Sequence, residues 1–475
     1  MHIGAPTPGR ERRRHARCAG RPARDGPSAQ LLLRAQSHRR PRRQAGRARA
    51  PQQRPHDPAQ LHDCGTRAHG EPRHVDARRA RALHADPARL LHLLLPRGRA
   101  REEGHDRHAR RRAMIARLVS LATAVPPHAV TQADAREFAR GLFRDVLRED
   151  HDRLLAVFEH AGIRERHVCA PLEWYARDHD FAEKNALYIE HAVRLGGEVA
   201  TRALERAGLA PDDIDHLVFV SSTGIAAPSV DARIANALGL RSDFHRTPIW
   251  GLGCAGGAAG LARARDFALA RPGARVLLVA LELCSLTFQR NDLSKRNLVA
   301  ASLFADGAAA ALVVAGPDDE APHANGRRPL DLVASASTFW NDTLDVMGWD
   351  VDGGGLHVVF ARDIPTIVRE RVRPGLAEFL GRHDLSLEAI DHVVAHPGGM
   401  KVLAAYEQAL GLGRDALAHA RAVLRDHGNM SSPTCLFVLE RALEAQAIGA
   451  GETAVLSALG PGFCAEYLLM RGAAA

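Results

Sequence analysis

The sequence is poor in the residues that hold small disulfide scaffolds, zinc sites or membrane spans together. It has 7 Cys, which are Cys18, Cys64, Cys169, Cys254, Cys284, Cys435 and Cys464. No two of them stand at CxxC spacing, so we expect free thiols and no metal site. No apolar run approaches the length of a membrane-spanning helix, and the N-terminus lacks the apolar core of a secretory signal. We therefore expect a cytoplasmic protein without stable membrane insertion.

An excess of basic charge is also absent from most of the chain. The formal net charge is +9, but residues 1–113 hold 28 Arg and only 10 acidic residues. The remainder holds 36 basic and 45 acidic residues, so it is mildly acidic. Such a chain offers no broad basic surface, and we expect no nucleic-acid partner for it.

Residues 1–113 lack any persistent helical or strand periodicity and are dominated by Arg, Ala, His and Pro. A segment of this composition buries too little apolar surface to offset its ordering entropy, which predicts disorder. Two interpretations are open. The segment is either a basic tail that binds polyanions or, as we favour, a GC-rich upstream region that is not native protein. The pattern changes at Met114, which we expect to be the true start.

Beyond Met114 the chain alternates amphipathic helices with short apolar strands, which indicates an α/β protein. Helices are predicted at 131–148, 151–161, 190–208, 229–238, 254–271, 361–381, 400–410 and 431–448, and strands at 116–121, 216–221, 275–282, 308–315, 330–336, 392–395 and 453–458. Similar strand-to-turn patterns recur on both sides of a polar, Pro-containing segment at 317–329. We expect two pseudo-repeated α/β halves, at 114–325 and 326–475.

A glycine-rich stretch, IWGLGCAGGAAG at 249–260, carries Cys254 at the predicted start of a helix. Free N–H groups and the helix dipole at that place favour an anion, which would lower the pKa of the thiol and produce a nucleophile. Cysteine is also among the most buried residue types, so for this stretch alone we favour a packing role.

Two further polar residues stand where a strand or loop meets the next element. His396 ends the apolar strand in VVAHPGGMK (393–401), and Asn429 lies in the loop DHGNMSSPT (426–434). Either residue alone would be interpreted as structural. Cys, His and Asn together form a candidate acyl-transfer set, although spacing alone does not bring them into contact.

The combination resembles the type III polyketide synthases, the chalcone and stilbene synthase superfamily of the thiolase fold. The resemblance runs from about Met114 to Met470 and rests on GLGCAGG, LFADGAAAALV, AHPGGMKVL, HGNMSSPT and ALGPGFCAEYLL, in that order. It implies a layered α-β-α-β-α arrangement. In general appearance the chain is most similar to bacterial enzymes that make alkylpyrones or alkylresorcinols.

The resemblance implies a mechanism for the three polar residues. Cys254 would hold the acyl group of an acyl-CoA starter, which we expect to be a long aliphatic chain, as a thioester. His396 and Asn429 would hydrogen-bond the thioester carbonyl of malonyl-CoA while it loses CO2 and attacks that starter. Repeated extension and ring closure would follow. The family acts as a homodimer on CoA thioesters and needs no cofactor.

The resemblance also implies residues that contact substrate. Those expected to line the cavity are Cys284, Thr287, Phe304, Val358, Ser222, Thr223, Gly460, Pro461 and Gly462. In the stretch GGLHVVFARDIP (354–365), a shift of the register by two residues would place Phe360 at the position assigned to Val358. Arg164 and Arg166 are candidates for binding CoA phosphates.

Three alternatives remain at the level of the sequence. A ketoacyl-carrier-protein synthase III would also use Cys, His and Asn, but such enzymes typically carry His-Gln-Ala-Asn where this chain has His396-Pro397-Gly398-Gly399. A chalcone synthase-like enzyme would take an aromatic starter. A polyanion-binding protein would act through its Arg-rich segment.

Overall fold

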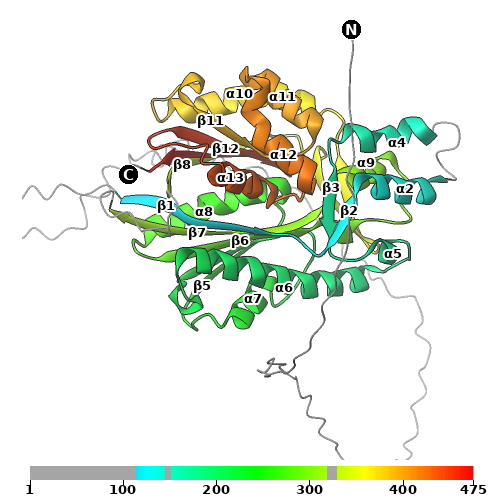
Figure 1. The fold of residues 1–475 in the computed structure, drawn as a ribbon, viewed down its shortest axis with the longest axis horizontal. Coiled ribbons are helices and arrows are strands. Elements are labelled where there is room, and N and C mark those ends of the chain that lie inside the picture. Colours follow the sequence, from blue (N-terminus) through cyan, green and yellow to red (C-terminus); the bar gives the residue numbers. More distant parts are fainter. Residues whose placement is uncertain (1–113, 145–150, 318–328, 474–475) are drawn as a thin grey trace, which may run out of the picture. The chain divides into compact units, whose positions relative to one another are not determined.

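A computed structural model describes residues 114–144, 151–317 and 329–473 (Figure 1). The Arg-rich segment 1–113, the end of the predicted helix 131–148 and most of the polar segment 317–329 lie outside the described residues.

The central feature is a nine-stranded mixed sheet. Its strands follow the order β11 (His392–Ala395), β12 (Thr453–Gly460), β13 (Cys464–Gly472), β8 (Leu330–Phe339), β1 (Met114–Ala124), β7 (Asp306–Pro317), β6 (Arg275–Leu283), β4 (His216–Val220) and β5 (His245–Ile249). β4 pairs in parallel with β5 and β6, β11 pairs in parallel with β12, and the other neighbours are antiparallel. β1 and β8 join the two halves of the sheet through only three residue pairs, between 116–118 and 330–332.

Helices divide and cover this sheet in five layers (Figure 1). The buried helices α8 (Gly256–Ala270) and α13 (Thr434–Glu444) lie between the two halves. One outer layer holds α6 (Phe181–Ala207) and α7 (Val230–Leu238), and the other holds α10 (Ile364–Gly381) and α11 (Met400–Leu410). The α-β-α-β-α arrangement expected from the sequence is confirmed.

The small residues of α8 allow this middle layer to form. A Cβ atom added at Gly257 would lie 2.1 Å from the main-chain oxygen of Ser432, and one added at Gly260 would lie 2.7 Å from the side chain of Leu278. Because the first half of α8 is packed from both sides, residues 256–262 are all buried Gly, Ala or Leu, and the charged residues Arg263, Arg265 and Asp266 stand only in its second half. α8 therefore packs closely against the segment that begins α13 on one side and against the sheet on the other.

Two β-ribbons and several short helices form the region next to α8. They are β2 (His128–Thr131) with β3 (Glu165–Val168), β9 (Met347–Asp352) with β10 (Gly355–Phe360), and the helices α2 (Gln132–Leu142), α4 (His151–His160), α5 (Leu172–Tyr175), α9 (Lys295–Leu303) and α12 (Ala418–His427). The sequence predicted α2 and α4 but neither ribbon, because short half-buried strands carry little periodicity.

The larger differences from prediction have physical causes. The helix predicted from residue 190 begins at Phe181, where the Asp180 carboxylate accepts a hydrogen bond from the Glu183 N–H at 2.8 Å. β13 was not predicted, because all but one of its residues are buried and its sequence therefore lacks alternation.

Candidate active site

Cys254 lies in a 3₁₀ turn, Gly253–Ala255, that leads directly into α8. The turn requires left-handed backbone conformations, with φ of 93° at Gly251 and 45° at Gly253. The Ser222 hydroxyl oxygen fixes it by accepting hydrogen bonds from the N–H groups of Gly251 and Gly253 at 3.1 and 3.3 Å. Ser222 therefore holds the turn that presents the thiol.

The environment of Cys254 disfavours a free thiolate. The side chain is 5% exposed, and burial raises its pKa to about 11. The negative charge of Glu282 also raises the pKa, whereas hydrogen bonds from the Ser431 and Asn429 side chains lower it. The Sγ atom lies 3.4 Å from the Ser431 hydroxyl. The expectation that the helix start lowers this pKa is wrong for the unliganded site, because desolvation outweighs the hydrogen bonds.

Asn429 is held in place by main-chain pairing with the end of α9. Its N–H donates to the Leu303 carbonyl at 2.9 Å, and its carbonyl accepts from the Ala305 N–H at 2.9 Å. Its side-chain amide donates to the Gly398 carbonyl at 3.3 Å, and its Oδ1 accepts from the Ser431 N–H at 2.8 Å. Asn429 thus links the loop that contacts Cys254 to the loop that follows His396.

His396 follows the last residue of β11, and its N–H donates to the Ser457 carbonyl of β12 at 2.8 Å. The side chain is 4% exposed, yet both ring nitrogens lack a hydrogen-bond partner. Burial lowers the pKa of the imidazole to about 4. A buried, neutral imidazole with two unused nitrogens has hydrogen-bonding capacity that a ligand can satisfy.

Glu282 is a further buried group of this site that the sequence analysis missed. It is 0% exposed at the end of β6, and its carboxylate accepts hydrogen bonds from the Ser222 N–H, the Thr223 hydroxyl and the Ser432 hydroxyl at 2.9, 2.8 and 3.0 Å. Burial raises its pKa to about 7 in spite of these bonds. The signal in the sequence was a single acidic residue inside the apolar strand RVLLVALEL.

The glycine-rich loop that follows β12 packs directly on the nucleophile turn. A Cβ atom at Gly460 would lie 2.4 Å from the Leu252 carbonyl oxygen, and one at Gly253 would lie 2.8 Å from the Pro461 ring. The predicted residues Gly460, Pro461 and Gly462 therefore lie beside Cys254, as a stretch without bulky side chains.

A mostly apolar cavity of about 90 Å³ is lined by Phe304, whose main chain pairs with Asn429, but not by Cys254, His396 or Asn429 themselves. Four of the predicted substrate-binding residues line it, namely Cys284, Thr287, Phe304 and Val358. Its other walls come from α2, α5, α9, the β2–β3 ribbon and the segments next to them. Thr223 instead borders a second, smaller cavity of about 10 Å³, which Thr287 also lines. Val358 faces the main cavity, and Phe360 stacks on Phe304 with 5.6 Å between the ring centres.

The two predicted CoA-binding arginines differ in environment. The Arg164 side chain is 68% exposed and forms an ion pair with Asp426 at 3.1 Å. Arg166 is 3% exposed, and its guanidinium donates to the carbonyls of Ala301, Ser302 and Phe304 at 2.7–2.8 Å. Arg166 therefore braces the C-terminus of α9, and the prediction that it binds a CoA phosphate is corrected by this position.

Comparison with known proteins decides the family. Residues 103–317 match the chalcone and stilbene synthases, N-terminal domain, and residues 331–474 match the C-terminal domain of the same family. The chain belongs to the chalcone and stilbene synthases. These enzymes are type III polyketide synthases, so the chain is an acyltransferase-type condensing enzyme that acts on CoA thioesters.

Individual relatives agree with this assignment. The chain is 42% identical over 356 residues to a 1,3,6,8-tetrahydroxynaphthalene synthase of Streptomyces peucetius subsp. caesius, a match that covers 74% of this chain and 92% of the relative. The crystal structure of the 1,3,6,8-tetrahydroxynaphthalene synthase of Streptomyces coelicolor A3(2), described as a bacterial type III polyketide synthase, superposes with a TM-score of 0.70 at 32% identity. That match covers 76% of this chain and 100% of the solved one.

A polyketide synthase of the brown alga Ectocarpus siliculosus gives a TM-score of 0.69 at 27% identity, covering 76% of this chain and 98% of the other. The predicted thiolase-like fold and the type III polyketide synthase family are thus confirmed. The family match in both halves of the chain displaces the ketoacyl-carrier-protein synthase alternative. The relatives do not confirm the alkylpyrone or alkylresorcinol subtype, which stays a prediction.

Within the described part of this type III polyketide synthase, no helix is long and apolar enough to cross a membrane. The same residues contain no group of three or more His, Cys, Asp or Glu side chains arranged to hold a metal ion.

Proposed function

We propose that this enzyme condenses malonyl units onto an aliphatic acyl-CoA starter that Cys254 holds as a thioester. The observation that carries the proposal is the pair of unpartnered nitrogens on the buried His396, in a cluster where Asn429 is connected to both Cys254 and the loop after His396. A substrate carbonyl oxygen is a hydrogen-bond acceptor that such donors can hold.

The first step loads the starter. At neutral pH the thiol of Cys254 and the imidazole of His396 are both uncharged, given pKa values of about 11 and about 4. In the proposed step the thiol proton passes to His396, the thiolate attacks the acyl-CoA carbonyl, and the carbon–sulfur bond to CoA breaks. The proton leaves with the CoA thiol, so the site returns to its neutral state.

The second step extends the chain. Malonyl-CoA loses CO2, and the electron pair of the broken carbon–carbon bond becomes an enolate. Its oxygen accepts hydrogen bonds from His396 and Asn429. The enolate carbon attacks the thioester on Cys254, and the Cys254 thiolate leaves, so the extended chain is carried on CoA. For the next round the thiolate attacks that CoA thioester, and the departing CoA thiolate takes a proton from water, which supplies the proton that decarboxylation consumes. Since decarboxylation generates the nucleophile, the step needs neither a strong general base nor a cofactor. Cyclisation to an alkylpyrone or alkylresorcinol-type product ends the sequence.

The aliphatic starter is supported by the lining of the main cavity. Phe138 of α2, Phe143 directly after α2, and Ala300 and Ala301 of α9 contribute apolar surface in addition to Phe304. Burying each methylene of a starter against such walls contributes about 0.8 kcal/mol. The names of the relatives favour tetrahydroxynaphthalene as a second candidate product, and an aromatic starter is a third possibility.

Product analysis tests these candidates. The full chain is incubated with malonyl-CoA alone and with hexanoyl-, lauroyl-, palmitoyl- or benzoyl-CoA, and products are identified by mass spectrometry. We expect condensed products from the aliphatic starters. Cys254→Ala, His396→Ala and Asn429→Ala should each abolish them, whereas Cys435→Ala, a change at another buried thiol, should not. Product formation by Cys254→Ala at the wild-type rate would refute the mechanism.

We also propose a cytoplasmic homodimer in which the half at 114–325 supplies Cys254 and the half at 326–475 supplies His396 and Asn429. Dimerisation is supported by Ile225 and Trp250, which are 48% and 51% exposed near the turn that Ser222 holds. Sedimentation of the full chain tests the dimer.

Arg164 is proposed to bind CoA phosphate. Retained activity after removal of residues 1–113 would support the view that this segment is dispensable.

A further inference from the structure

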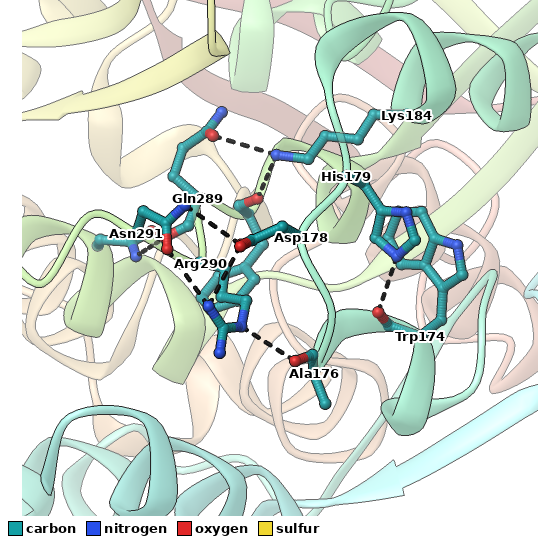
Figure 2. A network of polar contacts seen from close by, with 10 residues as sticks. Trp174, Ala176, Asp178, His179, Lys184, Gln289, Arg290 and Asn291 are labelled. Atoms are coloured by element: carbon teal, nitrogen blue, oxygen red, sulfur yellow. Dashed lines mark hydrogen bonds and ion pairs between the residues drawn. The ribbon is translucent and has the colours of Figure 1, made fainter.

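Lys184 is a buried cation whose two hydrogen bonds go to uncharged oxygens. It lies in the first turn of α6 and is 8% exposed. Its Nζ atom donates to the Phe288 carbonyl at 2.9 Å and to the Gln289 side-chain oxygen at 3.1 Å (Figure 2). Burial lowers its pKa. Burying an ammonium group costs stability, so stability alone does not explain why Lys184 lies here.

Gln289 extends the network to two more segments. Its side-chain amide donates to the Leu356 carbonyl of β10 at 3.0 Å. Its own carbonyl accepts a hydrogen bond from the Asn297 side chain of α9 at 2.7 Å. Lys184 and Gln289 therefore connect four segments, namely the start of α6, the strand-to-helix segment after Thr287, β10 and α9.

Three of these four segments form walls of the main cavity. The segment after Thr287 contributes Phe288, β10 contributes Val358, and α9 contributes Ala300. Lys184 and Gln289 do not line that cavity; they border the smaller cavity together with Thr223 and Thr287. Any effect of the two residues on the starter must therefore pass through the walls that they hold.

We propose that Lys184 and Gln289 are positioning residues that fix the separation of these three walls and so set which starter length the cavity accepts. The proposal rests on the condensing function proposed above. Hydrogen bonds have narrow ranges of length and angle, so a buried and satisfied network fixes the relative position of the segments that it joins. Apolar contacts between the same segments would permit sliding.

A neighbouring residue provides a matched control. Arg290, next in sequence to Gln289, donates to the Ala176 carbonyl at 3.0 Å and to Asp178 at 3.2 Å on the outer side of the same segment (Figure 2). Its side chain is 36% exposed and lines neither cavity. Arg290→Met therefore removes polar contacts of the same segment without releasing β10 or α9.

The test compares kcat/KM for lauroyl-CoA and hexanoyl-CoA in the full chain. Lys184→Met removes both contacts of the ammonium. Gln289→Glu keeps an acceptor for Lys184 but places an oxygen against the Leu356 carbonyl, so only the connection to β10 is lost. We expect both variants to change the lauroyl-to-hexanoyl ratio by about tenfold, the size of effect that one methylene has in an apolar pocket. The change should lie mainly in KM, because Cys254, His396 and Asn429 are unaltered.

Two further measurements separate positioning from general stability. Lys184→Arg, which retains donors for both oxygens, should restore the wild-type ratio. Hydrogen exchange should become faster at the amides of β9 and β10 in Gln289→Glu, and remain unchanged in β6 and β7.

The results of these measurements separate the positioning role from the proposed condensing function. An unchanged ratio in Lys184→Met and Gln289→Glu, or an equal change in Arg290→Met, would overturn the positioning role while leaving the condensing function intact. Failure of both variants to fold would also overturn it in favour of a purely structural role. Absence of product from the wild-type enzyme with every starter would instead contradict the proposed function itself.

Discussion

Replacing Glu282 with glutamine should change how the stability of the enzyme depends on pH. Glu282 is fully buried beside the nucleophile turn, and its pKa rises from the usual 4.5 to about 7 because of burial. Glutamine has nearly the same shape and can retain the hydrogen bonds from Ser222 and Thr223 through its oxygen. The Ser432 hydroxyl, which donates to the carboxylate, would rotate to accept from the new amide.

The stability of the wild type should fall with rising pH because the folded state holds the Glu282 proton more tightly than the unfolded chain does. Between the two pKa values the folded protein keeps the Glu282 proton, whereas the unfolded chain has released it. The stabilising contribution of Glu282 to the free energy of unfolding is therefore fully present below pH 4.5 and is lost as the pH rises through about 7. A pKa difference of this size corresponds to about 3 kcal/mol of unfolding free energy. The glutamine variant has no such titration.

Urea unfolding of the full-length wild type and Glu282→Gln, from about pH 5 to about pH 8, measures this difference. Subtracting the two curves removes the titration of groups that both proteins share, such as Asp306. We expect the stability of Glu282→Gln relative to wild type to rise by about 3 kcal/mol across the window. Ser432→Ala, which keeps the carboxyl group, should retain the wild-type slope. A difference that stays constant with pH would refute the reasoning.

Three further substitutions test the packing around the site, and two of them have a control substitution. Gly257→Ala should destabilise the fold by about 1–3 kcal/mol, because its Cβ would meet the Ser432 main-chain oxygen. Its control, Gly197→Ala in α6, has no atom within 4 Å of the new Cβ and should stabilise the fold by about 0.5–1 kcal/mol. Urea unfolding measures both variants. Arg166→Met should cost about 3 kcal/mol, because three carbonyls lose their donor, whereas the exposed Arg164→Ala should change stability by less than about 0.5 kcal/mol in the same assay. Ala300→Leu should fill the cavity and lower kcat/KM for lauroyl-CoA relative to hexanoyl-CoA by about tenfold in competition assays; an unchanged ratio would place the starter elsewhere.

The motifs in the sequence identified the family and most of the regular elements. Cys254, His396 and Asn429 each stand where a strand or loop meets another element, and such junctions are visible as changes of hydrophobic periodicity. The strands at 216–221, 275–282 and 392–395 were predicted to within one residue at each end, because they are short apolar runs bounded by turns. β5, β13 and α9 were missed, since their patterns do not alternate or repeat clearly.

The environment of each site residue depended on contacts distant in the sequence. Cys254 was expected to have a lowered pKa from its place before α8, but burial raises that pKa in spite of the hydrogen bonds of Ser431 and Asn429. Arg166 looked like a surface cation, yet the end of α9 covers it. Neither outcome can be derived from neighbours in the chain.

The sequence by itself determined an α/β protein with a candidate Cys-His-Asn set, because glycines, strand ends and cap residues are local requirements of the backbone. The resemblance of its motifs added the type III polyketide synthase family. Only the tertiary structure decided that Glu282 lies buried beside the thiol, that His396 has two unsatisfied nitrogens, and that Lys184 and Gln289 connect the cavity walls. Burial and hydrogen bonding between distant segments set these properties, and a linear pattern contains no measure of either.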